Sequence, residues 1–113
     1  MAAPGEWLLA CDADDIDEED VIRVDLAGRT LAIYRSPEST FHATDGICTH
    51  ERADLADGLV MGDIIECPKH NGRFNYKTGE ATRVPASISL CTYPVKVDGG
   101  QVFVKLDGAT SPR

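Results

Sequence analysis

Two short clusters of cysteine and histidine place the strongest constraint on how this chain can fold. Cys48-Thr49-His50 forms the first and Cys67-Pro68-Lys69-His70 the second, with sixteen residues between them. Thiolates bind soft or borderline metals, and imidazole suits iron and zinc. Turn residues at 57–58 and 61–63 allow the intervening chain to run out and back as strands. A metal bound by all four side chains therefore requires a fold that brings two loops side by side.

Two metal groups fit two cysteines and two histidines: a tetrahedral structural zinc and a [2Fe–2S] cluster with mixed ligands. Zinc fingers usually pair cysteine with cysteine and histidine with histidine, whereas each loop here supplies one of each. A two-iron cluster explains that arrangement, because one iron would take Cys48 and Cys67 and the other His50 and His70. The all-cysteine ferredoxin spacing C-x4-C-x2-C is absent. The spacing favours the cluster, and zinc is the alternative.

The rest of the sequence has the composition of short antiparallel strands. Turns that contain Gly or Pro separate runs rich in β-branched and aromatic residues, as hairpins require. The clearest hairpin surrounds Asp98-Gly99-Gly100, and no segment of ten residues shows a helical period. Strands are predicted at residues 21–26, 30–35, 40–44, 73–76, 81–84, 92–97 and 101–106. The predicted fold class is therefore all-β, with the two Cys/His loops inserted in the sheets.

Length and charge limit the function further. The 113 residues fit one domain, and a net charge of −8 argues against nucleic acid and anionic membranes as partners. The acidic surface instead suggests steering toward a basic patch on a partner protein. The stretch DADDIDEED at 12–20 is interpreted as a solvated turn or short helical turn. No transmembrane window or signal peptide is recognised, so a cytoplasmic, reducing location is expected.

The two Cys/His boxes resemble those of Rieske [2Fe–2S] proteins. The resemblance covers nearly the whole chain and implies one cluster per chain, held by Cys48, His50, Cys67 and His70. It also implies a single domain over 1–113, with a β-sandwich base and a cluster-binding subdomain at about 45–86. A third, proline-containing loop covers the cluster in this family, and Val84-Pro85-Ala86 stands where that loop is expected.

Departures from the respiratory-chain members of this family are informative. Those proteins carry a disulfide between the boxes, whereas Ala53 and Lys69 occupy the matching positions here. They also place a Ser and a Tyr after the second box as hydrogen-bond donors to the cluster, and here Gly72 and Phe74 stand instead. Without those donors the reduction potential is expected near the low end of the Rieske range, nearer about −150 mV than about +300 mV.

The resemblance therefore points to a ferredoxin of a bacterial oxygenase system. The chain would carry one electron from a flavin-dependent reductase to a terminal Rieske non-haem iron oxygenase in aromatic or small-molecule catabolism, and would act as a monomer. The stretch at 47–74 is also similar to rhizopine-catabolism ferredoxins. A small subunit of an assimilatory nitrite reductase and a zinc-stabilised interaction module are the alternatives.

The remaining histidine and cysteines limit what else the chain can do. A catalytic iron of the Rieske oxygenases needs two His and a carboxylate, and ligation of a cluster leaves only His42, so no enzymatic activity is predicted. His42 is interpreted as a surface histidine, and Cys11 and Cys91 as buried thiols. Trp7 is expected to anchor the first strand in the core. Candidate partner contacts beside the ligands are Glu51, Arg52, Lys69 and Asn71.

Overall fold

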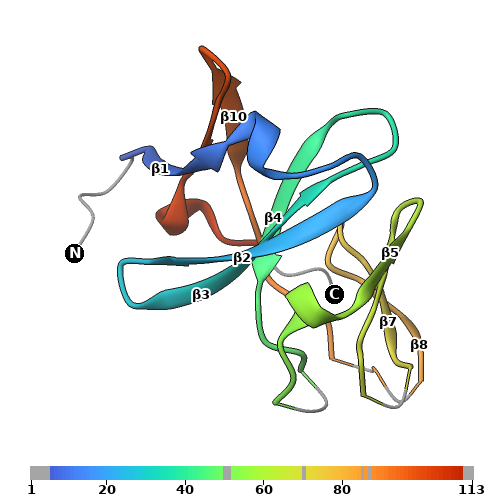
Figure 1. Ribbon diagram of the computed structural model, residues 1–113. Helices are drawn as coiled ribbons and strands as arrows, with labels where there is room; N and C mark the ends of the chain where they lie inside the picture. The colour runs from blue at the N-terminus through green and yellow to red at the C-terminus, as the bar shows by residue number, and fades with distance from the viewer. Residues whose placement is uncertain (1–5, 50–51, 70, 85, 87, 111–113) are drawn as a thin grey trace.

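The computed structural model describes residues 6–49, 52–69, 71–84, 86 and 88–110. Within them the chain forms three antiparallel sheets and three single-turn 3-10 helices, η1 (Ala13–Asp15), η2 (Leu55–Asp57) and η3 (Leu106–Gly108). The all-β prediction is confirmed (Figure 1). No helix in these segments is long and apolar enough to span a membrane.

Two of the sheets form the base of the molecule. One has the order β1-β11-β10, from Leu8–Asp12, Gln101–Val104 and Val95–Asp98. The other has the order β2-β3-β4-β9, from Asp20–Leu26, Arg29–Arg35, Phe41–Asp45 and Thr92–Tyr93. A core of Leu31, Ile33, Ala43, Val102 and Val104 fills the space between them. This base is the predicted sandwich.

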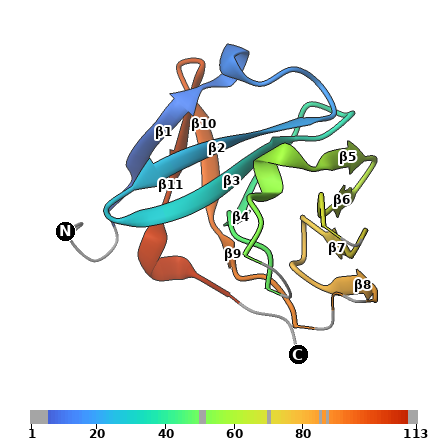
Figure 2. The same ribbon diagram turned by 60° about the horizontal axis from the view of Figure 1, so that its bottom comes forward.

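The third sheet lies on the other side of β3 and carries the Cys/His region. It has the order β5-β6-β7-β8, from Leu59–Met61, Ile64–Glu66, Arg73–Asn75 and Ala81–Arg83. Figure 2 shows this sheet beside the base, with the loops that follow β4 and β6 at one end of the molecule.

Strand β3 connects the two cores, because both of its faces are buried. Leu31 and Ile33 point into the core of the base, while Ala32 and Tyr34 pack in a second core beneath the third sheet. All four are fully buried. A strand buried on both faces reads as a continuous apolar run rather than an alternating one, as the sequence TLAIYR does.

Most of the predicted strands are observed within a residue or two of the expected ends. One is divided: residues 92–97 form β9 and β10, separated by Pro94. Proline has no backbone N–H to donate to a ladder, so a single strand cannot run through it. The chain changes sheets at this point, since β9 pairs with β4 and β10 pairs with β11.

Two placements differ from expectation. Trp7 is only partly buried and is absent from both cores; its ring lies under the ammonium groups of Lys96 and Lys105, at 4.9 and 5.8 Å. Cys11 and Cys91 are also partly exposed, although both pack against the core of the base. The apolar sequence around these residues gives no information on how far each side chain is covered.

The acidic stretch at 12–20 is a short helical turn, as expected. Its first residue, Asp12, ends β1; helix η1 follows at Ala13–Asp15, and β2 begins at the last residue, Asp20. Ile16 is buried in the core of the base, at 1% exposed, and Ala13 packs against the same core. The acidic side chains therefore surround a buried anchor.

Gly79 lies where the third sheet contacts the chain leading into β9, and replacing it by alanine probes how closely the two are packed. Its φ is +84°, and a Cβ there would lie 2.2 Å from the carbonyl oxygen of Leu90. Gly62 has a similar φ of +60° but open space around it. We expect Gly62→Ala to cost about 1 kcal/mol of unfolding free energy from backbone strain alone. Gly79→Ala should cost about 1–3 kcal/mol more, because the backbone of Leu90 has to move.

Chemical denaturation of the two variants and the wild type measures this difference. Equal destabilisation by the two substitutions would show that the contact between Gly79 and Leu90 does not constrain the junction.

Candidate metal centre

The two cysteines of the Cys/His boxes lie in the same core. Cys48 and Cys67 are 4% and 1% exposed, and both belong to the core beneath the third sheet, together with Phe74 and Ala86. His50 and His70 lie outside the described residues. The fold therefore brings the two predicted thiol ligands to one buried region from loops that are sixteen residues apart in sequence.

The two loops are closed in the same way. The amide of Cys48 donates to the carbonyl of Ala53 at 2.9 Å, and the amide of Cys67 donates to the carbonyl of Gly72 at 2.7 Å. Each cysteine thus begins a loop that returns to it five residues later. Ala53 and Gly72 are both buried. Backbone closure fixes the start of each loop without a disulfide brace at the positions of Ala53 and Lys69.

A third segment lies against the first box. The hydroxyl of Thr49 donates to the carbonyl of Ile88 at 2.6 Å. Ala86 is 3% exposed and shares the core with both cysteines, and its amide donates to the carbonyl of Arg83 at 3.1 Å. Val84, by contrast, is 78% exposed. Pro85 lies outside the described residues.

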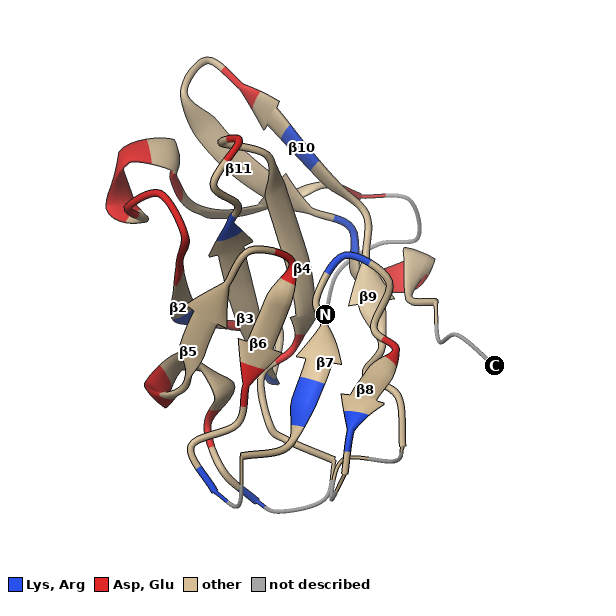
Figure 3. Ribbon diagram, turned by 90° about the vertical axis from the view of Figure 1, so that its right-hand side faces the viewer, with Lys and Arg blue, Asp and Glu red and all other residues tan. Residues whose placement is uncertain are grey.

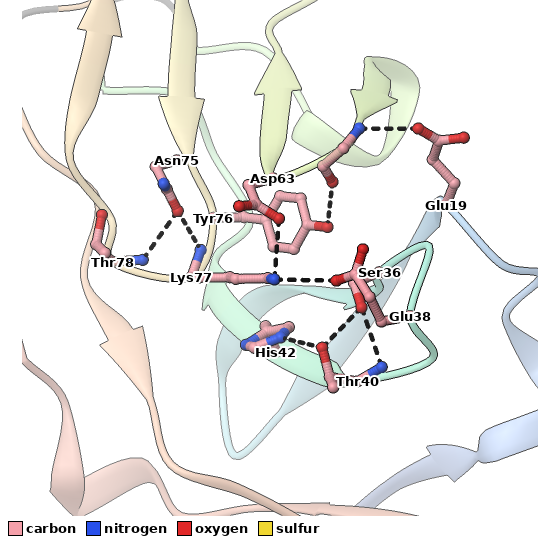
Figure 4. A network of polar contacts seen from close by, with 11 residues as sticks. Glu19, Ser36, Glu38, Thr40, His42, Asp63, Asn75, Tyr76, Lys77 and Thr78 are labelled. Atoms are coloured by element: carbon pink, nitrogen blue, oxygen red, sulfur yellow. Dashed lines mark hydrogen bonds and ion pairs between the residues drawn. The ribbon is translucent and has the colours of Figure 1, made fainter.

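Polar contacts join the third sheet to the base (Figure 4). The ammonium group of Lys77, after β7, lies 2.9 Å from Asp63 in the β5–β6 turn and 3.2 Å from Glu38 in the β3–β4 loop. Beside it, the amide of Gly62 donates to Glu19 at 2.8 Å. These contacts cross from the Cys/His region to the base at two places and hold the third sheet in position.

His42 is partly buried beside this junction rather than lying freely on the surface. Its Nε2 is hydrogen-bonded to the hydroxyl of Thr40 at 2.8 Å, and its ring lies 5.6 Å from that of Tyr76 (Figure 4). Burial lowers the pKa of His42, and the nearby Lys77 ammonium lowers it further. The folded protein therefore makes protonation of His42 less favourable than in an exposed imidazole.

The donor set fits a metal group that takes thiolates. Two buried cysteines occupy equivalent places in two similar loops, and each box carries a histidine two or three residues later. Among the described residues, which include neither His50 nor His70, no three His, Cys, Asp or Glu side chains gather as a metal site. Either a mixed-ligand iron–sulfur cluster or a zinc ion could use such a set.

Comparison with known proteins decides between these groups. Residues 6–94 match the Rieske [2Fe-2S] domain. The chain is similar to the ferredoxin component of the naphthalene 1,2-dioxygenase/salicylate 5-hydroxylase systems of Ralstonia sp, with 42% identity over 101 residues. The aligned region covers 89% of this chain and 96% of the relative. The chain belongs to the Rieske [2Fe–2S] domain family, whose cofactor is the iron–sulfur cluster and not zinc.

Solved structures agree in fold. The Sphingomonas yanoikuyae B1 ferredoxin superposes with a TM-score of 0.84 at 35% identity, covering 88% of this chain and 98% of that one. A chain of the complex of reduced oxygenase and oxidised ferredoxin in carbazole 1,9a-dioxygenase gives a TM-score of 0.82 at 39% identity, covering 88% and 92%. Both of these structures, matched over more than nine-tenths of their length, are of proteins named as ferredoxins or as complexes that contain one.

Sequence reasoning did not predict the junction around Lys77. Lys77 pairs with Asp63 and Glu38, which lie in two other turns. The sequence shows that these residues are charged, but not that they come together. The partial burial of His42 was missed for the same reason, since it results from Tyr76 packing against it.

The lowered pKa of His42 predicts a specific pH dependence. The imidazole should titrate below its usual value of about 6.5. The unfolded chain binds this proton more readily than the folded one. The contribution of neutral His42 to the free energy of unfolding is therefore complete above about pH 6.5 and is lost as the pH falls. Substitution of Lys77 by Met should raise this pKa, since it removes a neighbouring cation and leaves Asp63 and Glu38 in place.

NMR titration of 15N-labelled histidine measures both effects. Lys96→Met, at a cation on the opposite sheet, is the matched control and should leave the titration unchanged. A midpoint at or above 6.5 in the wild type would contradict the placement of His42.

Proposed function

We propose that this chain carries one electron at a time through a single [2Fe–2S] cluster held by Cys48, Cys67, His50 and His70. The two cysteines would bind one iron and the two histidines the other. The observation that carries this proposal is the burial of Cys48 and Cys67 in one core, each at the start of a loop closed by the same backbone hydrogen bond. When bound, such a cluster accepts and returns one electron.

The same proposal assigns the partners. Electrons would come from a flavin-dependent ferredoxin reductase and go to a terminal Rieske non-haem iron oxygenase, as the names of the dioxygenase-system relatives support. The carrier would be a cytoplasmic monomer. Its single domain would span 1–113, and its cluster-binding subdomain, at about 45–86, would include the third sheet.

The hydroxyl groups of the core around the cysteines already donate hydrogen bonds to other groups, which supports a low reduction potential. The hydroxyl of Tyr76 donates a hydrogen bond to the carbonyl of Gly62 at 2.5 Å. Thr44 donates to the carbonyl of Asp45, so in the 2.8 Å contact between Tyr34 and Thr44 the tyrosine is the donor. Both tyrosines share the core with Cys48 and Cys67, yet each has already committed its one hydroxyl proton.

Phe74 completes this environment. It is fully buried in the same core, at the position where the respiratory-chain proteins carry a tyrosine. Its ring excludes water but donates no hydrogen bond to sulfur. Since such bonds stabilise the more negative reduced state, an environment with few of them favours a potential near the low end of the Rieske range.

Metal and redox analysis of the purified protein tests the function. We expect about two irons and two sulfides per chain, no stoichiometric zinc, and uptake of one electron per chain in a reductive titration. Substitution of His50 by Ala should abolish the assembled cluster or change its absorption spectrum. His42→Ala is the matched control, because it removes an imidazole that is not a proposed ligand.

An unchanged spectrum in the His50 variant would refute the ligand assignment. Stoichiometric zinc without iron would refute the function itself.

The potential provides a second test. Substitution of Phe74 by Tyr places a hydroxyl in the core beside the two cysteines and should raise the reduction potential. One hydrogen bond of about 1 kcal/mol that favours the reduced state corresponds to about 40 mV for a one-electron couple. Direct electrochemistry measures the shift, and Phe103→Tyr, on β11 in the base, should show none. A Phe74 variant that retains its cluster at an unchanged potential would contradict the account of the low potential.

A further inference from the structure

A cavity lies between the third sheet, the base and η3. Its volume is about 420 Å³, within the range of about 300–1,000 Å³ that is typical of small-molecule sites. Figure 3 looks onto this side of the molecule, with β9 between the β7–β8 turn and η3. None of the four proposed cluster ligands lines this cavity. Its lining therefore has a chemistry of its own to be explained.

One part of the cavity wall is apolar. Phe41 lies at the start of β4, and Pro94 and Val95 lie where the chain passes from β9 to β10. Phe41 and Val95 are partly exposed and Pro94 is exposed, so all three offer surface to a bound molecule. Aromatic rings pack favourably against such surfaces and against other rings. The wall therefore favours a ligand with an aromatic body.

A chain of hydrogen bonds fixes the tautomer of His42, which lines the same cavity (Figure 4). Ser36 is fully buried, and its hydroxyl accepts a hydrogen bond from the amide of Thr40 at 3.0 Å. Among the described residues its own proton has one acceptor, the Thr40 hydroxyl at 2.7 Å. The Thr40 proton is then directed to Nε2 of His42, at 2.8 Å. Nε2 is thus an acceptor, and the neutral ring carries its proton on Nδ1.

The Nδ1–H group of His42 is a donor that the fold leaves open. Nδ1 makes no hydrogen bond to a described residue, and none of their buried polar side-chain atoms lacks a partner, so Nδ1 is accessible. The Thr40 contact and the ring of Tyr76, 5.6 Å away, hold the imidazole in place. Above about pH 7 the ring is uncharged, because its pKa lies below the usual value. The cavity therefore presents one fixed, neutral donor.

The charges around the cavity select an uncharged ligand. Lys77 also lines it, but its ammonium group already pairs with Asp63 and Glu38. These three groups leave an excess of one negative charge, in a chain whose net charge is −8, so an anion is repelled. A cation is disfavoured by the ammonium group and by the N–H of His42. A neutral molecule meets neither obstacle.

We infer that this cavity binds a small, uncharged aromatic carbonyl compound, whose oxygen accepts a hydrogen bond from Nδ1–H of His42. The aromatic body of the ligand lies against Phe41, Pro94 and Val95. This site is additional to the proposed electron transfer and does not depend on the cluster. It gives the partly buried His42 a role that its distance in sequence from the Cys/His boxes does not suggest.

NMR of the 15N-labelled protein at about pH 7.5 tests the inference with two probes of equal size, acetophenone and benzoate. Acetophenone should produce saturable shift changes confined to residues that line the cavity, with a dissociation constant of about 1 mM. Benzoate carries a charge and should bind at least about tenfold more weakly. Absence of saturation, changes centred elsewhere, or benzoate binding as tightly as acetophenone would overturn the inference.

Two further measurements test the role of His42. Histidine 15N shifts of the free wild-type protein should report a proton on Nδ1, and a proton on Nε2 would overturn the inference without any variant. His42→Phe keeps a ring but removes the donor, so the affinity for acetophenone should fall about fivefold. Phe103→Tyr, on β11 and outside the cavity lining, is the matched control and should bind as the wild type does. Equal affinity in all three proteins would show that His42 is not the donor.

Discussion

The proposed metal site depends on two backbone hydrogen bonds, from the amide of Cys48 to the carbonyl of Ala53 and from the amide of Cys67 to the carbonyl of Gly72. They close the loops at Cys48 and at Cys67 with the same spacing, and so bring two thiols from separate parts of the sequence into one buried region. Buried polar groups need partners, and these bonds satisfy the cysteine amides without using the side chains. Both cysteine side chains are buried in the same core, at 4% and 1% exposed.

The rest of the fold supports those two loops. Strand β3 has two buried faces and so packs the base and the third sheet into one unit. Stacked rings of Tyr34 and Tyr76, with centroids 4.5 Å apart, span the boundary between them, and the ion pairs of Lys77 close it at the surface. A rigid support of this kind suits an electron carrier, since a ligand set that moves little between oxidation states reduces the reorganisation needed for transfer.

Local patterns predicted much of this structure, and contacts between distant segments account for what they missed. Hairpins around Gly28 and Gly99 follow from turn chemistry. The division of the strand at Pro94 could have been predicted, because proline interrupts a ladder. The position of Trp7 under two lysines, and the packing of His42 against Tyr76, depend on how the sheets fold together.

The central claim is that two cysteines and two histidines hold a two-iron cluster with its ligands divided by type. Pulsed electron paramagnetic resonance of the reduced protein, with 15N incorporated only in histidine, tests this claim most directly. The account predicts hyperfine coupling to two histidine nitrogens, in a signal whose average g-value is lower than that of an all-cysteine cluster. A reduced signal without histidine coupling, or with coupling to one nitrogen alone, would contradict it.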